Sequence, residues 1–202
     1  MGARETLIRV QAFEGFLPYA EAYRAEQLAQ PFYDIRYSDG ELYKHVNVRP
    51  PQEIAPHLER LLGKKVTLDY CLTRLNYAGE MPNNSVHTDD AFSFFAYILY
   101  LNLPEQCKGG TAFWRHKKYG WTEMPSHNEV LRTGKSPARI YAQLREDMNN
   151  LDAWEQVHLE EMAFNKLICF PCKQWHSRWP WAAFGSDKSD ARLINVGFFS
   201  VG

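Results

Sequence analysis

The sequence lacks the features that mark secreted, membrane-spanning or highly charged proteins. It has only four cysteines in 202 residues, too few for a disulfide scaffold, so we expect a reducing, cytoplasmic compartment. No run approaches the roughly 18 to 20 apolar residues that cross a bilayer, and no membrane span is predicted. The 23 Lys and Arg residues nearly balance the 24 Asp and Glu residues. Neither nucleic acid nor a membrane is therefore expected as a partner.

The composition is typical of one globular domain. Hydrophobic residues make up 45% of the chain, and at this length one core can bury roughly 70% of the surface that the unfolded chain exposes. We therefore expect a single domain over residues 1–202. Aromatic residues make up 14% and include six tryptophans, which favours a pocket lined partly by rings.

The order of predicted elements indicates an α+β protein. Helix-like spacing of apolar residues predicts helices over 13–30 and 52–63, and we interpret residues 1–65 as helical support. From residue 66 onward, β-rich runs bounded by turn residues dominate. They predict strands over 66–77, 91–103, 111–116, 166–171 and 191–201. Several antiparallel strands without interleaved helices favour a sandwich or barrel with the helices packed outside.

One segment interrupts the β pattern. Residues 122–162 contain two stretches, 140–150 and 151–162, that both read as helical. An insertion of this length between core strands is usually functional, so we expect a lid or substrate-selecting element.

A set of polar residues next to predicted strands suggests a metal site. His87 and Asp89 are separated by one residue, so on an extended chain both side chains point to the same side. His176 follows a later β run, and two His with one carboxylate form the facial triad of Fe(II) oxygenases, which leaves coordination positions open. Arg192 opens the last predicted strand, and its guanidinium suits a dicarboxylate co-substrate. Lys188 is an alternative partner for that anion.

Four segments in this order resemble those of the Fe(II)/2-oxoglutarate-dependent dioxygenases, first the prolyl-4-hydroxylase-like branch and second the AlkB-like branch. They are RLNYAGEMPNNSVHTDD (74–90), YILYLNLPEQCKGGTAFW (97–114), LICFPCKQWHSRWPW (167–181) and ARLINVGFF (191–199). The resemblance spans about residues 66 to 200. It implies a double-stranded β-helix, or jelly-roll, core over 66–202 with 122–162 inserted between core strands.

The resemblance also implies an activity. It implies hydroxylation of an amino-acid side chain, free or in a peptide or protein, or of a small metabolite, with O2 and with decarboxylation of 2-oxoglutarate to succinate. The implied Fe(II) ligands are His87, Asp89 and His176, and the implied co-substrate contacts are Arg192, Asn76 and Tyr77.

Two departures and three alternatives remain. The connection 185–191 is longer than the prolyl-hydroxylase pattern, which keeps Lys188 open, and the second arginine of the AlkB pattern is missing. The protein is alternatively a catalytically silent jelly-roll binding protein. A nucleobase or nucleotide oxidase is a further alternative, with the basic segment 115–121 contacting the phosphates. The last alternative is a zinc or redox site at Cys169, Cys172 and His176.

Overall fold

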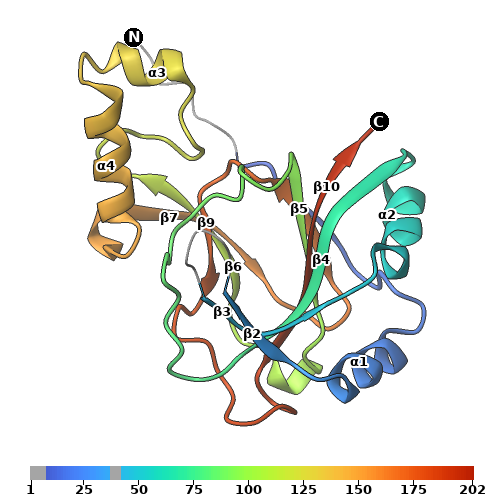
Figure 1. Cartoon of the computed structure of the whole chain (residues 1–202). Coiled ribbons are helices and arrows are strands. Elements are labelled where there is room, and N and C mark those ends of the chain that lie inside the picture. The colour runs from blue at the N-terminus through green and yellow to red at the C-terminus, as the bar shows by residue number, and fades with distance from the viewer. Residues whose placement is uncertain (1–7, 37–41) are drawn as a thin grey trace.

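The computed structural model describes residues 8–36 and 42–202, so parts of the predicted support region, 1–7 and 37–41, lie outside the described residues. Two antiparallel sheets form the body of the protein (Figure 1). Phe113 of the smaller sheet packs edge-on against Phe170 of the larger one, with ring centroids 5.2 Å apart. The two sheets therefore share a hydrophobic core, consistent with the predicted sandwich or barrel of antiparallel strands.

Within residues 8–36 and 42–202, the larger sheet has seven strands and the smaller has three, all paired antiparallel. In spatial order the larger contains β1 (Gln11–Phe13), β8 (Leu167–Pro171), β5 (Phe95–Tyr100), β10 (Arg192–Val201), β4 (Val66–Asn76), β3 (Leu42–Val48) and β2 (Tyr33–Arg36). The smaller contains β7 (Trp154–Glu161), β6 (Gly110–His116) and β9 (His176–Trp179). The helices are α1 (Ala20–Ala29), α2 (Ala55–Leu62), α3 (His127–Arg132) and α4 (Pro137–Asp147), with 3₁₀ turns at Pro51–Glu53, Pro104–Gln106 and Leu151–Ala153.

The two N-terminal helices cover the outer face of the larger sheet, as predicted (Figure 1). Leu58 of α2 is completely buried against the leucines of β4, and Gly63 ends the helix in the left-handed conformation with φ 64°. Helix α1 is shorter than the predicted 13–30. Residues Gln11–Phe13 form β1, the edge strand of the larger sheet, and its pairing with β8 takes Phe13 out of the helix.

Residues 1–65 are not purely helical support, which corrects the prediction. Strands β2 and β3 extend the larger sheet beyond β4, with Val46 paired to Arg74. These strands are short and contain charged residues, so their sequence carries little β pattern. The backbone groups that β4 presents at its edge stabilise them instead.

The prediction of a helix over 151–162 is wrong. Residues 154–161 form β7, which pairs with β6 from Gly110 opposite Glu161 to His116 opposite Trp154. Helix-forming residues dominate this stretch, but hydrogen bonding to the free edge of β6 outweighs propensities of a few tenths of a kcal/mol per residue. Of the predicted insertion, α3 and α4 are α-helices and Leu151–Ala153 is a 3₁₀ turn, whereas β7 belongs to the smaller sheet.

Helices α3 and α4 pack beside the smaller sheet (Figure 1). His116 of β6 is buried, and its Nε2 lies 3.0 Å from Asp147 Oδ2 at the end of α4. The ring of His116 also stacks on Tyr119 and meets Trp154 edge-on. These contacts hold the insertion against the sheet.

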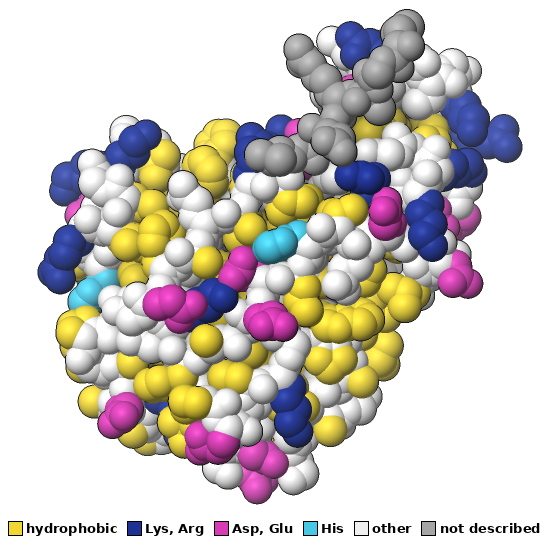
Figure 2. Space-filling model, turned by 180° about the vertical axis from the view of Figure 1, so that it is seen from behind, with side chains coloured by type: hydrophobic (Ala, Val, Ile, Leu, Met, Phe, Trp, Pro, Cys, Tyr) yellow, Lys and Arg dark blue, Asp and Glu magenta, His cyan; other side chains and the backbone are white. Residues whose placement is uncertain are grey.

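The surface mixes charge with apolar area. On the face seen in Figure 2, Lys and Arg side chains are scattered among hydrophobic and acidic ones. Among the described residues, no helix has the length and apolar character that crossing a membrane requires.

Candidate metal centre

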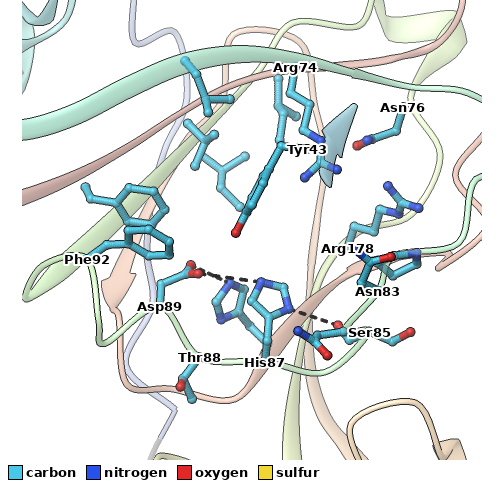
Figure 3. Close-up of a pocket in the computed structure, with 18 of the residues that line it drawn as sticks. Tyr43, Arg74, Asn76, Asn83, Ser85, His87, Thr88, Asp89, Phe92 and Arg178 are labelled. Atoms are coloured by element: carbon cyan, nitrogen blue, oxygen red, sulfur yellow. Dashed lines mark hydrogen bonds and ion pairs between the residues drawn. The ribbon is translucent and has the colours of Figure 1, made fainter. Parts of the chain in front are cut away.

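His87, Asp89 and His176 meet at the junction of the two sheets. His87 and His176 form a β-bridge in which each backbone N–H donates to the other's carbonyl at 3.0 Å. Asp89 Oδ2 lies 3.2 Å from His176 Nε2, and Asp89 Oδ1 lies 3.8 Å from His87 Nε2. The three ligand atoms lie within 4.8 Å of one another (Figure 3). They can therefore coordinate one metal ion.

Backbone hydrogen bonds orient both imidazole rings. Nδ1 of His87 donates to the Ser85 carbonyl at 3.2 Å, and Nδ1 of His176 donates to the Gln174 carbonyl at 3.0 Å. This turns each Nε2 toward Asp89, so that a metal ion could take the place of a proton on that nitrogen, as metal-binding histidines require.

The protonation states also suit a divalent ion. Burial and the neighbouring His176 lower the pKa of His87, so this imidazole is neutral at pH 7. Burial alone would raise the pKa of Asp89, but the charge and hydrogen bond of His176 outweigh it and lower that pKa. A neutral imidazole and an ionised carboxylate are the forms that bind a divalent metal.

The predicted insertion positions the loop that carries His87. The backbone N–H of Val86 donates to the Met148 carbonyl at 2.9 Å, and that of Ser85 donates to the Asn149 side chain at 2.9 Å. The Asn149 amide also donates to the carbonyl of Asn83 at 2.6 Å. The end of α4 therefore supports the metal-ligand loop, while no residue of 122–162 is among the described residues that line the cavity. This corrects the prediction of a lid.

The ligands border a cavity of about 330 Å³, within the small-molecule range. One end of this cavity is cationic. Arg192 is only 1% exposed, and its Nη1 donates to Asn76 Oδ1 over a long 3.4 Å. Arg192 Nε and Asn76 Nδ2 are buried and have no hydrogen-bond partner among the described residues. A buried guanidinium with a free N–H group, next to an amide with a free N–H group, forms a site for an anion.

Arg74 and Arg178 line the same cavity. Burial and the charge of Arg74 lower the pKa of Arg192 to about 10. Burial and the charges of Arg192 and Arg74 lower the pKa of Arg178 to about 9. Arg178 is held by the backbone carbonyls of Glu80 and Trp181. These like charges repel one another, and a bound anion would relieve that repulsion.

Comparisons with known proteins agree with this architecture. A protein-family profile described as "Family of unknown function (DUF6445)" matches residues 71–199, well over half of the chain. The chain belongs to the DUF6445 family. No curated protein matches the sequence of this DUF6445 protein.

Solved structures share the fold of this DUF6445 protein at low sequence identity. SnoK, described as a non-heme alpha ketoglutarate dependent carbocyclase from nogalamycin biosynthesis, has a TM-score of 0.57 at 13% identity, covering 97% of this chain and 80% of SnoK. AviO1 from Streptomyces viridochromogenes Tue57 has a TM-score of 0.54 at 13% identity, covering 96% and 90%. SnoN, described as a non-heme alpha ketoglutarate dependent epimerase, has a TM-score of 0.52 at 15% identity, covering 96% and 78%. The DUF6445 chain therefore shares the fold of SnoK, AviO1 and SnoN.

Tyr77 and Lys188, which were predicted as possible co-substrate contacts, lie outside the cavity. Asn76 faces the cavity as the last residue of β4, and strand alternation therefore directs Tyr77 away, where its ring lies 4.8 Å from His45. Lys188 donates to the Gln30 carbonyl at 2.8 Å and lies over the Phe32 ring, and it is not among the described residues that line the cavity.

The cysteine alternative gains no support from the geometry. Cys169 and Cys172 are free and buried, and burial raises the pKa of each thiol to about 12. Among the described residues, the metal-ligand cluster that includes His176 contains neither thiol.

The cavity is also lined by Arg178, Arg74 and Tyr43, which were not predicted as site residues. Arg178 lies two residues after His176, and Arg74 lies two before Asn76, so strand alternation from known residues would have found both. Tyr43 of β3 had no such signal. Figure 3 shows its ring reaching toward the metal ligands, and the guanidinium of Arg74 lies 5.6 Å from the ring centroid.

Proposed function

We propose that this DUF6445 protein is an Fe(II)- and 2-oxoglutarate-dependent oxygenase that hydroxylates a small molecule or an amino-acid side chain. One observation carries the proposal: the His87, Asp89 and His176 ligand atoms share a cavity with the buried, incompletely hydrogen-bonded Arg192. A structure of SnoN, with a TM-score of 0.50 and 15% identity, is described as a complex with Fe3+, alpha ketoglutarate and nogalamycin RO. We interpret the two facing sheets as the double-stranded β-helix of this fold.

Each group of residues has a distinct task. His87, Asp89 and His176 would hold the Fe(II) and leave three coordination positions open. Fe(II) with 2-oxoglutarate and O2 supplies the oxidation of an unactivated C–H bond and the decarboxylation of 2-oxoglutarate to succinate. Arg192 and Asn76 would bind the distal carboxylate of 2-oxoglutarate with their unpartnered donors.

The surroundings of these residues support that chemistry. Tyr100 carries a hydroxyl 2.7 Å from the Thr111 hydroxyl, and the charge of Arg192 counters the rise of the Tyr100 pKa that burial causes. Both residues are buried, and Tyr100 lies close enough to Arg192 for the two groups to interact electrostatically. The Phe170 ring, 4.7 Å from that of His176, limits the access of water to the ligands.

The alternatives have less support. In the basic segment, Arg115 pairs with Glu155 at 3.4 Å and Lys118 donates to Gln143 at 3.2 Å, and no residue of 115–121 is among the described residues that line the cavity. The basic segment 115–121 therefore gives no support to a nucleobase oxidase. The four free thiols support the cytoplasmic compartment that we propose.

Anaerobic titration with Fe(II) and 2-oxoglutarate tests the proposal. We expect the weak visible charge-transfer band of a keto acid chelated to Fe(II), and succinate after admission of air. His176→Ala should abolish both, because it removes one of three ligands. His158→Ala is the matched control, since His158 is partly exposed and pairs with Glu160 instead. Absence of the band in folded wild-type protein would leave the silent binding protein as the better description.

A further inference from the structure

The inner face of the larger sheet changes from charged to apolar along its strands. Four pairs of residues across β10 and β4 face the cavity. In order they are Arg192 with Asn76, Ile194 with Arg74, Val196 with Leu72, and Phe198 with Tyr70. Alternate residues of a strand are about 6.7 Å apart, so the four pairs span about 20 Å. The cavity has a cationic end and an aromatic end.

The metal ligands lie toward the aromatic end. The ring of His176 lies 4.7 Å from that of Phe170, which pairs with Ala96, and Ala96 pairs in turn with Phe198. Arg192 belongs to the opposite end, three pairs away from Phe198. A doubly charged 2-oxoglutarate bound to the metal would extend toward Arg192, which leaves the aromatic end for the substrate.

The aromatic end offers stacking surface and little charge. Phe92 stacks on Phe198, with ring centroids 4.9 Å apart and planes 20° apart, and Phe92 is 44% exposed at the border of the cavity. The described residues that line this end include Tyr70, Leu72, Ile98 and Val196, and their one charged group is the metal ligand Asp89. A charged group bound here would lose its hydration without gaining a partner.

We infer that the substrate is a neutral, largely apolar small molecule that places a planar ring against Phe92 and Phe198. This inference rests on the proposed function, because the bound 2-oxoglutarate leaves only the aromatic end free. The cavity volume of about 330 Å³ fits a small molecule or a single side chain. A ring stacked against this pair brings a neighbouring C–H bond toward Asp89 and His176.

The test uses three naphthalene derivatives that differ in charge: neutral 2-naphthol, anionic 2-naphthoate and cationic 2-(aminomethyl)naphthalene. Isothermal titration calorimetry measures their binding to full-length protein loaded with redox-silent Mn(II) and 2-oxoglutarate. We expect 2-naphthol to bind at least tenfold more tightly than either charged relative. Phe92→Ala should weaken it about five- to tenfold, since a stacked ring pair contributes about 1 kcal/mol.

Phe94→Ala is the control variant, and Phe198→Leu is a second test variant. Phe94→Ala should leave the affinity for 2-naphthol unchanged, because Phe94 is 75% exposed and is not among the residues that line the cavity. Phe198→Leu retains an apolar side chain in the core and should also weaken 2-naphthol binding. Neither Phe92→Ala nor Phe198→Leu should alter the affinity for 2-oxoglutarate, which binds at the other end.

The outcomes separate this inference from the proposed function. Tighter binding of 2-naphthoate, lost in Arg74→Gln, would overturn the inference in favour of an anionic substrate while Mn(II) and 2-oxoglutarate still bind. Equal affinities for 2-naphthol in Phe92→Ala and Phe94→Ala would overturn it as well. Binding of 2-naphthol without any binding of Mn(II) or 2-oxoglutarate would overturn the proposed function and, with it, the role of 2-naphthol's site as a substrate site.

Discussion

Replacement of Arg192 by methionine should strengthen the fold and weaken the binding of 2-oxoglutarate. Arg192 is buried, and the lowering of its pKa from 12.5 to about 10 corresponds to roughly 3 kcal/mol of unfavourable free energy for the buried charge. Against this gain, loss of the long hydrogen bond to Asn76 costs the variant about 1 kcal/mol of stability. We therefore expect Arg192→Met without ligand to be about 1–2 kcal/mol more stable than wild type, a rise in Tm of about 2–8 °C.

The same variant loses the charge-assisted bonds to the distal carboxylate. Such bonds contribute about 1.5–3 kcal/mol, so the Kd of 2-oxoglutarate for the Mn(II)-loaded protein should rise by roughly 10- to 150-fold. Calorimetric titration gives the Kd, and thermal unfolding with and without 2-oxoglutarate gives the two values of Tm. Lys188→Met is the control, because Lys188 points to the Gln30 carbonyl, and its Kd should match wild type. A less stable Arg192→Met protein with an unchanged Kd would refute the reasoning, since Arg192 would then be a structural cation.

Two further predictions concern parts of the protein away from the co-substrate. His116→Ala should lower the free energy of unfolding in urea by about 2–3 kcal/mol. The substitution leaves the Asp147 carboxylate without its buried histidine partner and opens space beside Trp154. An unchanged urea midpoint would show that the His116–Asp147 contact does not hold α4 against the sheet. Cys169 and Cys172, with pKa values near 12, should be about one part in ten thousand thiolate at pH 8, so a disulfide reagent should modify them only after unfolding; fast reaction in folded protein at pH 8 would contradict their burial.

Local sequence patterns predicted those features that depend on residues only a few positions apart. The spacing of His87 and Asp89 identified a ligand pair because both geometry and donor type are local, and the apolar face of residues 52–63 identified α2. The prediction of Tyr77 as a co-substrate contact overlooked the alternation of side chains along a strand. Tyr77 follows the inward-facing Asn76 and so points away from the cavity.

Long-range pairing decided what local patterns missed. Residues 154–161 have helix-forming side chains, yet they form β7 because β6 has an edge that requires a partner. The segment 122–162 was expected to form a lid, yet Asn149, just after α4, holds the loop before His87 instead. Both outcomes depend on which edges and loops the rest of the chain leaves free.

The sequence by itself determined the donor types, the one-residue spacing of the ligand pair and the strand that carries Arg192. Only the tertiary structure decided that His87 bonds to His176, and that one end of the cavity became cationic while the other became aromatic. The reason is physical. Backbone propensity and side-chain periodicity act over a few residues, whereas strand register is set by hydrogen bonds and packing between segments far apart in the chain.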